Sequence, residues 1–125
     1  MLDRNPREDV AANNLAMLLV TQRTDARSLD RAQALVERFA DSTIPAYLDT
    51  RGWVLYKRGD YPGAMEAFGK AVNLAPGARV LRYHLGLAQL KAGQTAEARE
   101  SLEAAVVDGP DYPGLQDARA LLKTM

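Results

Sequence analysis

The sequence that begins at residue 45 is repeated from residue 79, one step of 34 residues later. Residues 45–78 and 79–112 align without a gap, and eight positions are identical in the two copies. The identical pairs are Gly52/Gly86, Lys57/Lys91, Gly59/Gly93, Ala64/Ala98, Glu66/Glu100, Ala71/Ala105, Val72/Val106 and Pro76/Pro110. A fixed period of this length is typical of proteins built from stacked units. Such proteins act through a surface that the units share, so the repeat directs the question of function toward binding.

Each copy is predicted to contain two helices joined by a tight turn. In the first copy these helices cover residues 46–58 and 62–74. Gly59 suits the left-handed end of a helix, and Pro62 suits a first helical turn, where a missing N–H costs little. The second helix of each copy places apolar residues three and four positions apart, on one face. These residues are Ala64, Phe68, Ala71 and Val72, and in the second copy Ala98, Leu102, Ala105 and Val106.

This pattern resembles the tetratricopeptide repeat, a helix–turn–helix unit with small, large apolar and proline residues at fixed places. The matching residues are Gly52, Ala64, Phe68, Ala71 and Pro76 in the first copy, and Leu85, Gly86, Ala98, Leu102, Ala105 and Pro110 in the second. Two positions depart from the family: Arg51 stands where a core leucine is usual, and Trp53 lies past the usual tryptophan position. The resemblance implies an all-α, right-handed superhelical stack of helix pairs.

A looser unit, residues 7–44, precedes the two clear copies. Its helices are predicted at residues 10–20 and 28–40. Ala16 and Ala32 take the places of Gly52 and Ala64, but they lie 16 residues apart instead of 12. We expect the four additional residues to form a longer surface loop over residues 21–28, because insertions are tolerated where they touch no core.

A last helix is predicted within residues 113–125. Its apolar face would consist of Leu115, Ala118, Leu121 and Leu122, and a stack of repeats needs such a helix to cover its final interface. The sequence therefore predicts one domain over residues 1–125 with about seven helices. Its parts are three repeats, 7–44, 45–78 and 79–112, and a capping helix, 113–125.

Composition argues against several classes of function. The 16 Lys and Arg residues balance 16 Asp and Glu residues, so the chain lacks the basic excess of a nucleic-acid binder. It has no cysteine and one histidine, which excludes thiolate sites and histidine metal clusters. No apolar run approaches the roughly 18 residues of a membrane-spanning helix. We expect no enzyme activity, no cofactor, no metal, no nucleic-acid partner and no membrane insertion.

The concave face of the predicted stack is the candidate binding surface. The resemblance implies that residues from the first helix of each unit line this face. The predicted partner-binding residues are Asn13, Met17, Asp49, Thr50, Trp53, Tyr56, Lys57, Val80, Tyr83, His84 and Leu87. Apolar surface of this kind indicates binding, and Trp and Tyr are typical anchors. The alternative is that these side chains pack between helices or lie under further repeats.

The family resemblance also bears on the class of partner. Members that hold a C-terminal carboxylate do so with Lys, Asn and Arg side chains at five places. Here those places hold Asn13, Met17, Thr50, Val80 and His84, and none matches. We therefore expect a protein or peptide partner that presents an amphipathic helix or an extended apolar segment.

A second hypothesis is structural. Asn5-Pro6 resembles the end of a preceding repeat, which predicts an uncapped apolar edge that supports assembly or forms a homodimer. The sequences of residues 13–16 and 49–56 are similar to those of the last repeats of larger bacterial proteins of this family. Some of those proteins take part in exopolysaccharide production and protein export. The expected compartment is the cytoplasm by default, or the periplasm if a parent protein is exported.

Overall fold

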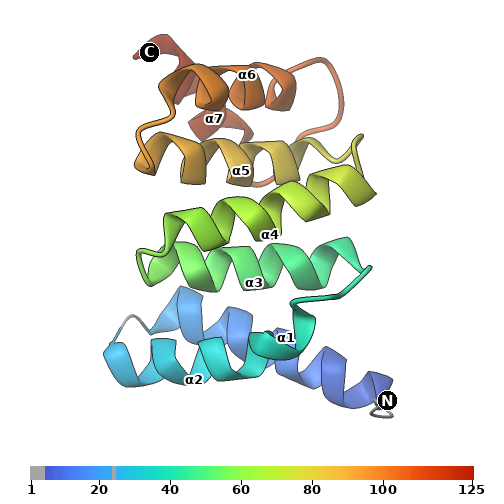
Figure 1. The fold of residues 1–125 in the computed structure, drawn as a ribbon. Helices are drawn as coiled ribbons and strands as arrows, with labels where there is room; N and C mark the ends of the chain where they lie inside the picture. The colour runs from blue at the N-terminus through green and yellow to red at the C-terminus, as the bar shows by residue number, and fades with distance from the viewer. Residues whose placement is uncertain (1–4, 24) are drawn as a thin grey trace.

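A computed structural model describes residues 5–23 and 25–125, and these residues form seven α-helices and one short 3-10 helix, η1. The elements are α1 (Pro6–Gln22), α2 (Ala26–Val36), η1 (Glu37–Phe39), α3 (Pro45–Lys57), α4 (Tyr61–Leu74), α5 (Arg79–Lys91), α6 (Thr95–Ala105) and α7 (Leu115–Lys123). The predicted all-α fold is therefore confirmed. Figure 1 shows the helix pairs stacked in chain order, with α7 at the same end of the molecule as α5 and α6.

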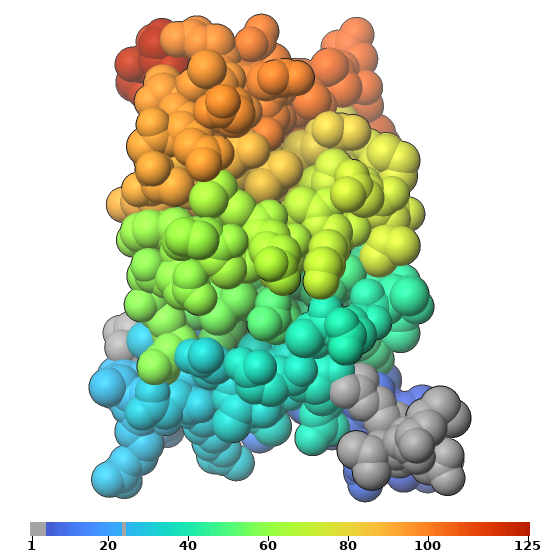
Figure 2. Space-filling view, viewed as in Figure 1, coloured from blue at the N-terminus to red at the C-terminus, as the bar shows by residue number. Residues whose placement is uncertain are grey.

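The helices pack in sequential pairs. α1 with α2, α3 with α4, and α5 with α6 form three hairpins, and the second helix of one hairpin contacts the first helix of the next. The first helices also contact one another, α1 with α3 and α3 with α5. Figure 2 shows the same order on the surface, where the colours follow one another in bands. Each hairpin is thus held by its neighbours, and the exact limits of the three repeats stay predictions.

The turn between α1 and α2 is shorter than the sequence predicts. The expected loop over residues 21–28 is wrong, because the turn has the same length as those that follow α3 and α5. The additional residues instead extend the helices. The carboxylate of Asp25 accepts a hydrogen bond from the Ser28 backbone N–H at 3.0 Å and from the Ser28 hydroxyl at 2.8 Å. This cap lets α2 begin earlier than predicted.

Other helix ends follow their local residues. Gly59 and Gly93 end α3 and α5 with φ values of 85° and 83°, as predicted for Gly59. Asn5 caps α1 through a bond from the Arg7 N–H at 2.9 Å, and Pro6 is the first residue of that helix. Asn5-Pro6 therefore begins a helix, so its predicted likeness to the end of a repeat does not hold as local structure.

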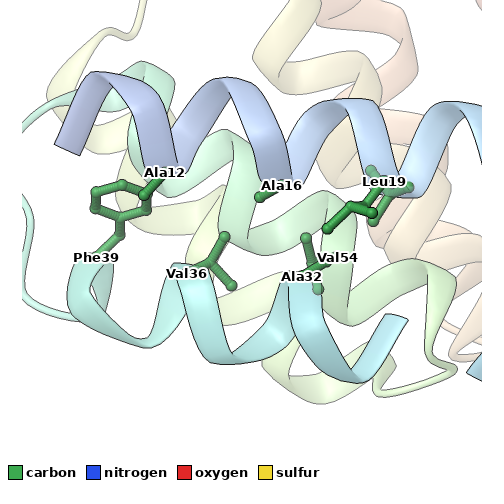
Figure 3. Close-up of a cluster of buried hydrophobic side chains, with 8 residues drawn as sticks. Ala12, Ala16, Leu19, Ala32, Val36, Phe39 and Val54 are labelled. Carbon is green, nitrogen blue, oxygen red and sulfur yellow. The ribbon is translucent and has the colours of Figure 1, made fainter. Parts of the chain in front are cut away.

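Small residues let the two helices of each hairpin approach closely. A Cβ built on Gly52 of α3 would lie 2.6 Å from the ring of Phe68 on α4, and one on Gly86 of α5 would lie 2.9 Å from Leu102 on α6. In the first hairpin Ala16 and Val36 are both fully buried. Figure 3 shows Ala16 on α1 opposite Val36 and Ala32 on α2.

The core continues from one hairpin into the next. Val54 of α3 is fully buried among side chains of the first hairpin, and Figure 3 shows it beside Ala32 and Leu19. In the same way, Ala88 of α5 packs against Phe68 of the second hairpin. The stack therefore has no break between its units.

The last helix, α7, covers the end of the stack. It contacts both α6 and α5, as α3 contacts α2 and α1. Its own residues Leu115 and Ala118 are buried, and Leu121 and Leu122 are partly buried. Gly114 precedes α7 with φ of 106°, at a point where a Cβ would overlap the Tyr83 ring. The predicted apolar face of this helix is therefore the face that packs.

We expect Gly52→Ala to lower the free energy of unfolding by about 1–3 kcal/mol, the usual cost of an added methyl group in a packed core. Gly69→Ala on α4 is the matched control, since nothing lies within 4 Å of a Cβ there. Because alanine favours helix more than glycine does, the control is expected to gain about 0.5–1 kcal/mol. Urea unfolding followed by circular dichroism measures both, and a Gly52→Ala protein as stable as wild type would contradict the close contact.

Candidate functional site

The aromatic side chains of α3 form a stacked pair. Trp53 and Tyr56 lie three residues apart, which places them on one side of the helix. Their ring centroids are 5.2 Å apart and the planes differ by 6°. Lys57 Nζ lies 5.3 Å from the centroid of the Trp53 ring, and Tyr61 at the start of α4 meets Tyr56 edge-on at 5.6 Å. Three half-buried rings and one exposed ammonium group thus share this surface.

Trp53 is held by packing on both sides. It contacts the core of the first hairpin and also the core formed by α3, α4 and α5. Its ring centroid lies 6.3 Å from that of Phe68 and 5.0 Å from that of His84. A ring held in this way loses little further freedom when a partner binds, which favours affinity.

A polar contact joins α3 to α5 beside Trp53. His84 Nδ1 lies 2.7 Å from Asp49 Oδ1, and the two side chains are only 18% and 15% exposed. The His84 ring also lies 5.6 Å from Phe68 and 5.5 Å from Tyr83. The Asp49–His84 contact therefore fixes the imidazole against the aromatic rings and links the second hairpin to the third.

The structure does not expose all the residues predicted for the groove. Thr50 is 2% exposed, and its hydroxyl donates to the Ala46 carbonyl at 3.1 Å. Tyr83 is 9% exposed, and it packs with Leu87 in the core beneath α7. Val80, on α5, is half-buried and packs against a core shared by α3, α4 and α5. These side chains contribute to helix packing. The family resemblance assigned their positions to an open concave face, but α7 and neighbouring helices cover them.

The predicted residues on α1 contribute less than those on α3. Met17 packs against the core of the first hairpin and is half-buried. Asn13 is also half-buried, and its Oδ1 is buried without a hydrogen-bond donor among residues 5–23 and 25–125. The accessible part of the predicted set is therefore centred on Trp53, Tyr56 and Lys57.

Two contributors to this surface were missed by sequence reasoning. Tyr61 belongs to α4, whereas the prediction considered only first helices; its position directly after the turn at Gly59 was the available signal. Asp117 lies on α7, and its negative charge acts on both Tyr56 and Tyr83. No internal repeat relates α7 to the helix pairs, so nothing in the sequence pattern placed Asp117 there.

The environment of the tyrosines favours their neutral form. Burial raises the pKa of Tyr56, and the nearby Tyr61 and Asp117 raise it further. Burial also raises the pKa of Tyr83, whose hydroxyl donates a hydrogen bond to Asp117.

Within the part of the chain that the structure describes, no three His, Cys, Asp or Glu side chains gather as a metal site. In the same residues, no helix has the length and apolarity needed to cross a membrane.

Comparison with known families agrees with this architecture. The profile of the tetratricopeptide repeat family matches residues 55–122, more than half of the chain. The chain belongs to the tetratricopeptide repeat family. Such repeats are generally protein–protein interaction modules, and no catalytic family was found. The matched region includes Tyr56 and Tyr61 and runs through most of α7. No curated protein matches the sequence.

The stability of this tetratricopeptide repeat protein is expected to fall above pH 10. At a pH above 10.0, the ordinary pKa of a tyrosine, the folded chain keeps the phenol proton of Tyr83, whereas the unfolded chain releases it. The resulting stabilisation is complete below pH 10 and is lost as the pH rises toward the folded-state pKa. Thermal melts between about pH 8 and 11 should show this loss, with a smaller slope in Tyr83→Phe and an intermediate slope in Asp117→Asn. An unchanged slope in Tyr83→Phe would contradict the assignment.

Proposed function

We propose that this protein is a non-catalytic interaction module that binds an apolar or amphipathic segment of a partner protein against the first helices of its repeats. The observation that carries the proposal is the Trp53–Tyr56 stack, with ring centroids 5.2 Å apart. Both rings are half-buried, so each keeps an accessible part. Large, fixed aromatic side chains of this kind supply most of the binding energy at many protein interfaces.

The charges beside the rings favour an apolar partner over a carboxylate tail. Asp49 is engaged with His84 at 2.7 Å, and Thr50 and Tyr83 are buried. Lys57 is the exposed cation at the rings, so a partner with one acidic residue next to its apolar side would suit this surface. A two-carboxylate tail would require several fixed cations and amides.

An alternative proposal is that the chain is the structural end of a longer array and supports assembly. The observation that favours it is apolar surface on the first hairpin, where Leu18 is 47% exposed. The resemblance to bacterial proteins of exopolysaccharide production and protein export suggests the processes in which such an assembly would act. The two proposals involve different surfaces, one centred on α3 and the other on α1, and can be tested separately.

Trp53 is the single tryptophan of the chain, so its fluorescence reports directly on the proposed surface. A photo-crosslinking amino acid at position 56 is expected to capture the partner in cells. The same group at Leu74, which is 46% exposed on α4, is the control. Equal capture at both positions would contradict the proposal.

Trp53→Ala is expected to weaken binding of the captured partner segment by about 2 kcal/mol or more, which corresponds to about 30-fold in Kd. Tyr56→Ala is expected to weaken it as well, with less disturbance of the core. Calorimetric titration measures both, circular dichroism confirms that the variants fold, and Leu74→Ala serves as the neutral control. Unchanged affinity in folded Trp53→Ala and Tyr56→Ala would rule out this surface as the binding site.

A further inference from the structure

The first hairpin carries apolar surface on the side away from the rest of the stack. Ala11, Leu15 and Leu18 lie four and three residues apart, on the edge of α1 that faces away from Met17 and Asn13, since each residue turns the helix by about 100°. Two adjoining hollows on α1 and α2 share Leu15. Leu18 in the second of these hollows is 47% exposed. We call this surface the end face.

The other two hairpins show what normally covers such a face. In the register that aligns Ala16 with Gly52 and Gly86, Leu18 corresponds to Val54 and Ala88. Both of those residues are 0% exposed. Val54 packs beneath the helices of the first hairpin, and Ala88 packs beneath those of the second. In both cases an amphipathic helix pair covers the face that α1 leaves open.

The rim of the end face is basic. Arg23, Arg27 and Arg31 line the second hollow, and none of them forms an ion pair with a carboxylate of residues 5–23 or 25–125. Arg23 directly follows α1 as Arg58 directly follows α3. Arg58 Nη1 lies 2.6 Å from Asp30 Oδ1, a carboxylate on the covering helix α2. In the register of the core residues Gln22, not Arg23, takes the place of Arg58, so the Arg58–Asp30 pair serves as an example of the contact that a guanidinium group at this rim would make with a carboxylate on a covering helix.

A second copy of the chain that docks through its own end face does not supply this charge. The charged residues of the two hollows are four arginines and one glutamate, Glu8. Two end faces brought together would each add the same positive excess, and like charges across an interface are unfavourable. An acidic helix satisfies both the apolar floor and the basic rim.

We propose that the end face of α1 and α2 docks an amphipathic helix of another protein, one that carries alanine- and leucine-sized side chains on its buried side and carboxylates along that side's border. Leu15 and Leu18 would contact the apolar side, and Arg23, Arg27 and Arg31 would pair with the carboxylates. This docking is independent of the Trp53 surface and does not rest on the proposed function.

The probe for this proposal is a synthetic helix with the sequence of residues 25–40, which includes α2, with Arg27→Glu and Arg31→Glu introduced in the peptide. The unchanged peptide is the charge control. Full-length protein is titrated with fluorescein-labelled peptide, and methyl NMR shifts locate the binding. Saturable binding of the acidic peptide is expected, with shifts at Ala11, Leu15 and Leu18, and at least about threefold weaker binding of the unchanged peptide.

Variants of the protein separate the apolar and charged contributions. Leu18→Lys is expected to weaken binding at least about tenfold, and Arg23→Glu with Arg27→Glu by about tenfold, since exposed pairs contribute up to about fivefold each. Leu74→Lys on α4 is the matched control for an exposed leucine, and it is expected to leave the Kd unchanged.

Three results would overturn the proposal. The first is the absence of saturable binding by the acidic peptide. The second is binding that the two arginine substitutions do not alter, which would indicate apolar contact without charge selection. The third is self-association of the wild type in sedimentation experiments that Leu18→Lys abolishes, which would make a second copy the occupant. Because Leu18 is half-exposed, its variant is expected to fold, and circular dichroism checks this.

Discussion

The structure depends on close approach of the two helices within each hairpin. At the crossing point one helix supplies a residue with almost no side chain and the other supplies a large one. The pairs are Gly52 with Phe68, Gly86 with Leu102, and Ala16 with Val36. Where the small residue gains a methyl group, as at Ala16, the large residue is the smallest of the three. Close-packed interiors impose this balance of volume, since an unbalanced pair would leave a void or a clash.

The binding surface inherits its order from this packing. Trp53 follows Gly52 directly, so the position of its ring is set by the same helix crossing. The ring then touches the cores of two hairpins and the His84 ring held by Asp49. A site on rigid helices with a supporting shell is better defined than one on loops. The surface is therefore part of the joint between repeats, and occupation of it would also reinforce that joint.

The sequence predicted the repeated core of the fold and the packed face of α7, and it missed features that depend on a single local contact. Core positions such as Ala64 and Phe68 were predictable, because identical packing requires similar residues in each copy. The length of α2 was not, because a polar stretch suits a loop and an exposed helix turn equally, and the Asp25 cap decided between them. The burial of Tyr83 was also missed. A repeat register treats all copies alike, whereas α7 covers only the last one.

The position of α7 continues the packing pattern of the stack. α7 contacts α5 and α6 in the way that α3 contacts α1 and α2, and the Tyr83 hydroxyl on α5 donates a hydrogen bond to Asp117 on α7. Separation of α7 from the third hairpin would break this hydrogen bond and expose Leu115 and Ala118 to water. Detachment of α7 therefore carries both a polar and an apolar cost in free energy.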